Sequence, residues 1–200
     1  MSSFLVLKTM ELIFATHNQH KTEEAREIAA SFIQIKNLKD IGCFEEIPET
    51  ADTLTGNALQ KARFVFDRYH VNCFADDTGL EVEALDGQPG VYSARFAGEH
   101  CTYQDNVDKL LREMKGKANR KACFKTVIAL ILDGQEHLFE GRVDGQIIED
   151  QRGVSGFGYD PVFLPDGFDR TFAEMSEEEK NSISHRGRAM RKMMEYLKKS

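Results

Sequence analysis

Apolar and polar residues form short blocks along this chain, and their spacing predicts strands and helices in alternation. The stretch ELIFAT, at 11–16, is apolar and too short for a core helix, so it predicts a buried strand. A helix with one apolar face is predicted over 20–31, followed by a strand at 32–35. Residues 57–70 again carry apolar side chains at helical spacing. The first third of the chain therefore predicts an α/β order.

The middle of the chain is richer in strands. Its Thr78-Gly79 pair predicts a turn between two of them, and Asp133-Gly134 is a strong hairpin signal between two others. A helix over 102–116 is predicted to end at Gly116. The apolar runs predict five strands, at 71–76, 80–85, 121–133, 136–145 and 145–150.

The chain is predicted to end in helix. Ser176 and Glu179 have the spacing of a capping box, and Met190, Met194 and Leu197 form an apolar stripe beyond it. No repeat or linker interrupts the 200 residues. We therefore expect one α/β domain over 1–200, with a mixed central sheet flanked by helices.

Composition narrows the possible partners. The chain has 33 acidic and 26 basic residues and a formal net charge of −7. A long polyanion is an unfavourable partner for such a chain, so no nucleic acid polymer is expected. A small phosphate-bearing ligand is not excluded, because a few converging cations are enough to bind one.

Cysteine usage indicates a reducing compartment. Cys43, Cys73, Cys101 and Cys123 are far apart and form no CxxC pair. Cys73 and Cys123 lie inside apolar runs, which favours buried free thiols over a disulfide framework. The sequence also has no glycosylation sequon, and we expect a cytoplasmic protein.

The amino-terminal segment MSSFLVLKTM has an apolar patch of only four residues. This is too short for a signal h-region or a membrane span, so no membrane partner is expected. A second methionine, Met10, opens MELIFATHN, which would itself be a sensible start. We therefore predict that residues 1–9 are a dispensable extension.

Two polar segments follow predicted strands. In THNQHK, at 16–21, a hydroxyl, an amide and an ammonium lie beside a helix N-terminus, which favours anions. An N-cap loop with a solvated lysine is the alternative. Asp76 and Asp77 repel one another and must be compensated, either by a hard cation such as Mg²⁺ or by turn amides. Because strand side chains alternate, the two carboxylates should point in opposite directions unless the turn rotates one.

Two further segments lie near the carboxyl end. In SGFGYDP, at 155–161, two glycines flank Phe157 and present its ring beside backbone amides, which suits stacking on a base. A glycine turn with Phe157 in the core is the alternative. Lys180, His185 and Arg186 suit phosphate or carbonyl oxygens, but they could also be a solvated helix face.

The four segments are complementary. Cations and helix-terminal amides suit a polyphosphate, carboxylates suit its metal, and an aromatic glycine loop suits a base. The sequence contains no Walker GxxxxGK[ST], no GxGxxG after a strand and no zinc-type Cys/His cluster. A nucleotide site here would therefore be of another kind.

Together, the four segments resemble the inosine triphosphate pyrophosphatase family, the non-canonical purine nucleoside triphosphate pyrophosphatases. FATHNQHK is similar to the family's T-x-N-x-x-K element, and ADDTGLEVEALDGQPGVYSARFAG to its central signature. GFGYDPVF and EEKNSISHRGRA are similar to its closing pair. These ordered motifs cover residues 11–197, which makes the resemblance specific.

The resemblance implies an elongated fold of two lobes around an active-site cleft, a homodimer, and Mg²⁺-dependent hydrolysis of ITP, dITP and XTP to monophosphate and pyrophosphate. It implies that Asp77 is the catalytic acid/base residue and a metal ligand, with Glu49 or Asp76 as the second metal carboxylate. Lys21 and Lys61 would act on the phosphates. The implied substrate contacts are Thr16, His17, Asn18, Gln19, His20, Lys21, Thr78, Phe157, Gly158, Tyr159, Asp160, Lys180, His185 and Arg186.

Two other functions remain open from the sequence. One is a related pyrophosphatase for pyrimidine nucleotides, and the other is a nucleotide sensor that keeps the base pocket without turnover. Base preference separates the first alternative from the purine enzyme. Metal-dependent turnover that needs Asp77 separates both enzymes from the sensor.

Overall fold

The computed structural model describes residues 9–200, which form an α/β domain around one mixed sheet. Strand β1 pairs in parallel with β2 and β3, and the remaining pairs are antiparallel. The order is β2-β1-β3-β5-β6-β7, with β4 attached to β3. The strands are β1 (Met10–Phe14), β2 (Ile33–Asn37), β3 (Cys73–Val82), β4 (Pro89–Gly90), β5 (Lys121–Leu132), β6 (Gln135–Ile147) and β7 (Phe163–Pro165).

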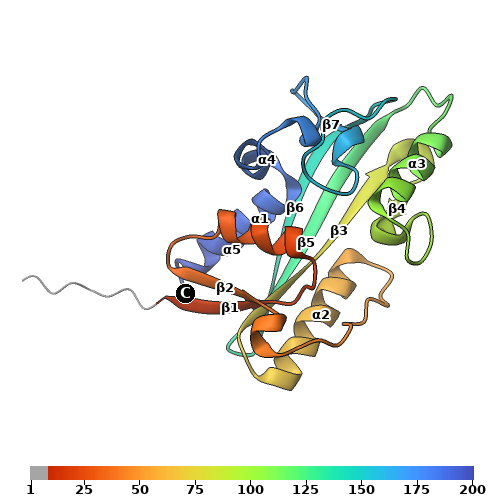
Figure 1. The fold of residues 1–200 in the computed structure, drawn as a ribbon. Helices are drawn as coiled ribbons and strands as arrows, with labels where there is room; N and C mark the ends of the chain where they lie inside the picture. Colours follow the sequence, from red (N-terminus) through yellow and green to blue (C-terminus); the bar gives the residue numbers. More distant parts are fainter. Residues whose placement is uncertain (1–8) are drawn as a thin grey trace, which may run out of the picture.

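Helices cover both faces of the sheet. At one end of the molecule, α2 packs on one face, while α1 and α5 pack on the other (Figure 1). The long strands β3, β5 and β6 continue to a second region with α3, β4 and β7, as expected for an elongated fold (Figure 1). The helices are α1 (Gln19–Ile28), α2 (Leu54–Tyr69), α3 (Tyr103–Glu113), α4 (Glu177–Ile183) and α5 (His185–Leu197).

Side-chain alternation along β3 places its residues on two different faces. Cys73 and Ala75 pack with the core of α2, whereas Phe74 packs with the core of α1 and α5. Continuing this period of two puts Asp76 toward α1 and α5, and Asp77 toward α2. The prediction that the two carboxylates point in opposite directions is confirmed by their separate partners, described below.

The predicted turn at Thr78-Gly79 is wrong. Both residues lie inside β3, paired with Thr126 and Lys125 of β5 in one unbroken ladder. Glycine is required at 79 for a close approach, because a Cβ there would lie 2.6 Å from the carbonyl oxygen of Gly90. The acidic pair is therefore inside a strand, not at a strand exit beside a turn, and Asp76 cannot act as a turn anchor.

Other predicted boundaries shift. Residues 83–85 form a 3₁₀ helix where strand 80–85 was predicted to end, because β3 stops at Val82. The separate strand predicted at 145–150 is wrong, since β6 continues through Ile147. Helix α2 begins three residues earlier than predicted, where the Thr53 side chain caps it.

The predicted hairpin turn and the predicted helix cap near the end of the chain are both confirmed. Asp133 and Gly134 both have positive φ, 49° and 80°, as a two-residue hairpin requires. Ser176 and Glu179 form the predicted capping box. The terminal helix is divided at Ser184, which ends α4 and caps α5.

The four cysteines are free thiols, and three of them are buried, as expected. Within residues 9–200, none of the helices is long and apolar enough to cross a membrane. The predicted dispensable extension falls, apart from Thr9, outside the described residues.

Candidate active site

Two adjoining cavities bring the four polar segments together. One is a pocket walled by Phe157, Tyr159 and His185, and the other is a cleft lined by Glu49 and Asp77, among others. Asn18, Lys21 and Ala94 line both cavities, so the two spaces meet at these residues. We call them the aromatic pocket and the acidic cleft.

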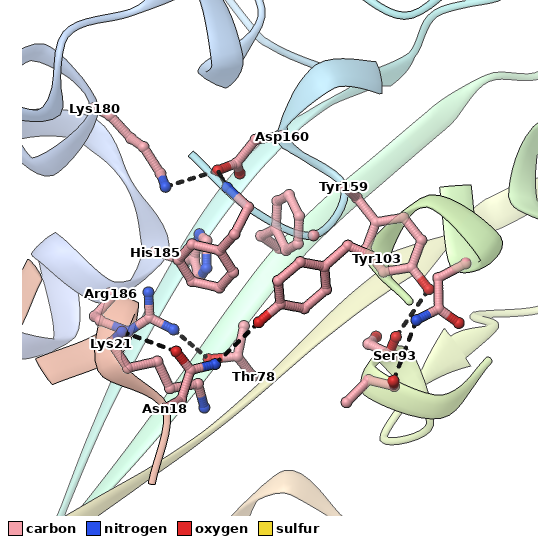
Figure 2. A pocket seen from close by; sticks show the side chains of 15 residues that line it. Asn18, Lys21, Thr78, Ser93, Tyr103, Tyr159, Asp160, Lys180, His185 and Arg186 are labelled. Carbon is pink, nitrogen blue, oxygen red and sulfur yellow. Dashed lines mark hydrogen bonds and ion pairs between the residues drawn. The ribbon is translucent and has the colours of Figure 1, made fainter. Parts of the chain in front are cut away.

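The loop between β1 and α1 is ordered by its own side chains at this junction. Thr16 Oγ1 accepts from the Asn18 amide at 3.1 Å, and Asn18 Oδ1 caps α1 by accepting from the Lys21 amide at 3.2 Å. This arrangement turns the N-terminus of α1, with its free N–H groups, toward the cleft. Tyr103 receives a hydrogen bond from the Asn18 side chain across the pocket (Figure 2).

Buried acidic and basic side chains form a cluster of ion pairs at the aromatic pocket. Asp76 pairs with Lys21 at 2.8 Å and with Arg186 at 3.0 Å. Glu24 pairs with Arg186 and, at 2.7 Å, with Lys180. Lys180 also pairs with Asp160 at 2.7 Å (Figure 2). Three cations and three carboxylates balance one another, as burial of charge requires.

On the other face of β3, Asp77 belongs to a smaller cluster with one lysine and a second carboxylate. Asp77 accepts from Asn57 at 3.1 Å and lies 3.5 Å from the Lys61 ammonium. Lys61 is also 2.8 Å from Glu49, so one cation lies between two carboxylates at the cleft. Asn57 and Lys61 come from α2, four residues apart, which places both on one helix face.

The neighbouring aspartates differ in ionisation. Although burial opposes the charge on Asp76, Lys21 and Arg186 hold its pKa well below the usual range. Burial raises the pKa of Asp77, and the more distant Lys61 only partly offsets this effect. One carboxylate is thus fixed as an anion, whereas the other is poised to accept a proton.

The glycine segment forms a tight loop around Asp160. Gly156 has a positive φ of 74°, and a Cβ there would lie 2.2 Å from Asp160 Oδ2. That oxygen accepts from the Phe157 amide at 2.9 Å. Within residues 9–200, the amides of Gly158 and Tyr159 have no acceptor, so they remain available at the pocket. The predicted pairing of an aromatic ring with exposed backbone donors is present.

His185 forms part of the pocket wall as a neutral ring. Burial, together with Arg186 and Lys180, holds its pKa well below the ordinary value. The ring stacks on Phe124, with centroids 4.6 Å apart and planes 12° apart. Gly141 makes this position possible, because a Cβ there would lie 1.9 Å from the His185 carbonyl oxygen.

Most of the predicted site residues line one of the two cavities. Three do not: Gln19 is exposed and bonds Glu23, and His20 stacks outside on Phe157 with centroids 5.5 Å apart. The third, Asp76, is buried beneath the two cavities and lines neither of them. His17 lines the cleft and bonds the carbonyl oxygen of Glu45 at 2.8 Å.

Sequence reasoning missed several residues that the fold brings to these cavities. Glu24 contacts residues more than 150 positions away, for which the sequence offers no local signal. Tyr103 opens α3, and Ser93 fixes β3 to the pocket wall through its hydroxyl. Ser93 and Arg95 stand within the central signature, but no role was predicted for them.

Four carboxylates line the cleft, and Glu49 and Asp77 are the two that both contact the Lys61 ammonium, so this pair could hold a metal. Within residues 9–200, no group of three or more His, Cys, Asp or Glu side chains is suited to a metal ion. Mg²⁺ often binds through one or two carboxylates, completing its shell with waters and substrate phosphates. Two hard oxygen donors, already arranged around the Lys61 cation, fit this requirement. Both Asp76 oxygens already accept from cations.

A family model described as "Ham1 family" matches residues 12–196. The chain belongs to the Ham1 family. This confirms the resemblance drawn from the four motifs. The match covers both cavities and every residue assigned to them.

Curated and solved members of the Ham1 family agree with this assignment. A dITP/XTP pyrophosphatase of Porphyromonas gingivalis is 57% identical over 188 residues, 94% of this chain and 97% of the relative. One of Flavobacterium psychrophilum is 52% identical over 189 residues, 94% of this chain and all of the relative. The structure of a HAM1 protein from Coxiella burnetii has a TM-score of 0.87 at 34% identity, covering 96% of this chain and 100% of that chain.

Proposed function

We propose that this chain hydrolyses the non-canonical purine nucleotides dITP, ITP and XTP to a monophosphate and pyrophosphate, with Mg²⁺ as cofactor. The observation that carries the proposal is the junction of the aromatic pocket with the acidic cleft at Asn18 and Lys21. A ligand with a planar base at one end and a polyphosphate at the other fits such a pair of cavities. The names of the relatives support the same substrates.

The aromatic pocket has the donors that a 6-keto purine needs. Phe157 offers a ring for stacking, and the free amides of Gly158 and Tyr159 can donate to a keto oxygen. Arg186 uses three of its nitrogens on Asp76, Glu24 and Thr78, and two of its five N–H groups remain. Adenine presents a 6-amino donor, which would leave these donors unpaired, and this mismatch is costly.

The acidic cleft can hold the phosphates. The N-terminus of α1 and the Lys21 ammonium favour anions at the junction, and Lys61 adds a second cation farther along. Glu49 and Asp77 would hold Mg²⁺, which when bound neutralises phosphate charge and polarises the phosphorus. Thr16 fixes the loop that carries Asn18, and this keeps the phosphate-binding amides in place.

Asp77 has the position and ionisation of a general base. Its carboxylate can orient a water and take its proton as the water oxygen attacks the α-phosphorus. The bond from that phosphorus to the bridging oxygen of the β-phosphate breaks, and its electron pair leaves with pyrophosphate. Lys21 and Lys61 stabilise the negative charge that develops on the leaving group.

Assembly and location remain part of the proposal. Free thiols in a chain of four cysteines support a reducing, cytoplasmic environment. A homodimer is implied by the family resemblance, and sedimentation equilibrium would show it as a particle of twice the 22.7 kDa chain mass.

The deciding experiment incubates purified protein and Mg²⁺ with ITP, dITP, XTP, GTP, ATP and UTP, and resolves pyrophosphate from orthophosphate. We expect pyrophosphate and monophosphate from the first three substrates, and no turnover with chelator present. Orthophosphate as the initial product would refute attack at the α-phosphorus. A preference for UTP would establish the pyrimidine enzyme, and tight binding without turnover would establish the sensor.

Replacement of the pocket ring should affect base binding more than chemistry. Phe157→Leu keeps an apolar side chain but removes the π face, and a base–aromatic stack contributes about 1–3 kcal/mol. We therefore expect KM for ITP to rise about 5- to 160-fold while kcat stays within a few-fold, measured by steady-state kinetics. Phe168→Leu, at a half-exposed ring away from both cavities, is the matched control. An unchanged KM in Phe157→Leu would contradict stacking.

A further inference from the structure

Two lysines and one arginine line the acidic cleft, and Arg95 differs from the two lysines in having no ionic partner within residues 9–200. Lys21 and Lys61 each form a close ion pair with a carboxylate. Within residues 9–200, the Arg95 guanidinium forms no hydrogen bond or ion pair, and it lies over the Tyr92 ring with Cζ 5.2 Å from the ring centroid. Its five donors are therefore available to an anion that enters the cleft.

The backbone beneath this free side chain is firmly held. Arg95 ends the 3₁₀ helix Ser93–Arg95. Ser93 Oγ accepts from the Leu80 amide at 2.9 Å and donates to the Gly90 carbonyl at 2.6 Å. The Tyr159 hydroxyl donates to the Ser93 carbonyl at 2.9 Å (Figure 2). A fixed attachment point reduces the ordering that ligand binding would require of Arg95.

The position of Arg95 relative to the junction indicates which phosphates it can reach. Ala94 lines both cavities, whereas Arg95 lines only the acidic cleft. A nucleotide with its base in the aromatic pocket must pass the junction before its outer phosphates enter the cleft. Arg95 therefore lies on the side of the β- and γ-phosphates, together with Lys61 and Asp77.

We propose that Arg95 is a catalytic residue that binds the β- and γ-phosphates and holds the pyrophosphate as it leaves. The proposal rests on the proposed function and adds a residue to it. Arginine forms two parallel charge-assisted hydrogen bonds with phosphate oxygens, which lysine cannot reproduce. Lys21 and Lys61 already balance carboxylates, so Arg95 supplies the positive charge that the cleft has not yet committed.

Separate titrations of the two products test this assignment. Pyrophosphate and IMP are each titrated, with Mg²⁺, into wild type, Arg95→Gln and Arg95→Lys, and binding is followed by calorimetry. We expect Arg95→Gln to weaken pyrophosphate binding about 10- to 100-fold, the effect of one charge-assisted contact, while IMP binding changes less than threefold. Arg95→Lys should recover part of the pyrophosphate affinity. In kinetics, Arg95→Gln should lower kcat/KM for ITP by a similar factor.

Controls separate this role from a structural one. Arg95→Gln should melt close to the wild-type temperature, because the side chain has no ionic partner to lose and only a half-exposed contact with the Tyr92 ring. Arg112→Gln, at an exposed position of α3 outside both cavities, should bind both products as wild type does. Unchanged pyrophosphate affinity in Arg95→Gln, or equal weakening for pyrophosphate and IMP, would overturn the assignment. Neither titration needs turnover, so a protein that binds both products without hydrolysing ITP would refute the proposed function and the catalytic role of Arg95, and would leave only its phosphate contact.

Discussion

Asp77→Asn is expected to lower the rate of pyrophosphate release from ITP by about 10³-fold, without unfolding the protein. Asparagine keeps the shape of the side chain at this buried position but can neither accept the proton of a water nor bind a metal as an anion. The same carboxylate serves both purposes in the proposed function. Steady-state kinetics with Mg²⁺, at pH 8, would measure the loss.

The stability of Asp77→Asn should be equal to or greater than that of wild type. Burial raises the pKa of Asp77, so the folded protein disfavours its charged form. Above the unfolded-state pKa, wild type therefore carries a penalty that the neutral amide removes. Lys61 keeps its ion pair with Glu49 in the variant. We expect the melting temperature at pH 8 to stay level or rise, a trade of stability for activity.

A matched variant and a pH profile complete this test. Asp67→Asn, at an exposed position of α2, should retain full activity. The wild-type rate should fall as acid protonates Asp77, because only the deprotonated carboxylate can accept a proton or hold Mg²⁺. Activity above a tenth of wild type in Asp77→Asn would remove Asp77 from the chemistry.

Local sequence patterns were sufficient to predict which segments supply side chains to the site. Two of its segments can be recognised from a few neighbouring residues: the polar run THNQHK at the start of a helix, and an aromatic residue between two glycines. Neither segment has the apolar spacing of a stretch that only packs in the core. The period of two in a strand predicted that Asp76 and Asp77 would separate, and the ion pairs confirm it. What could be predicted therefore depended on short sequence separations.

The errors arose where one residue type serves two purposes. Gly79 was taken for a turn residue, but it allows the Gly90 backbone to approach β3. Sequence alone does not distinguish the two uses. Likewise, Glu24 is one of several glutamates in α1, and only the fold shows that it meets Arg186, 162 positions away. The long ladder of β3 with β5 overrode the local turn signal.

Asp76→Asn should have the opposite effect to the change at its neighbour and should strongly destabilise the fold. Asp76 is 1% exposed and pairs with both Lys21 and Arg186. The amide would leave Lys21 without a counter-ion and Arg186 with Glu24 alone, and breaking a buried ion pair in this way costs about 3–5 kcal/mol. For a domain of this size, the melting temperature should fall by about 6–20 °C. Differential scanning calorimetry at pH 7 would measure the shift.

The stability difference between wild type and Asp76→Asn should depend on pH in a direction set by the lowered pKa of Asp76. Lys21 and Arg186 outweigh burial and lower the pKa of Asp76, so its stabilisation is complete above the unfolded pKa of about 3.9. It is lost as pH falls through the folded pKa, so the gap between wild type and Asp76→Asn should be constant from pH 5 to 8 and shrink in more acidic solution. Asp144→Asn, which breaks an exposed pair with Arg142, should cost at most about 1 kcal/mol. A different result would overturn this assignment: Asp76→Asn could melt like wild type and need only a higher Mg²⁺ concentration for activity. Asp76 would then be a metal ligand rather than the counter-ion that positions Lys21 and Arg186.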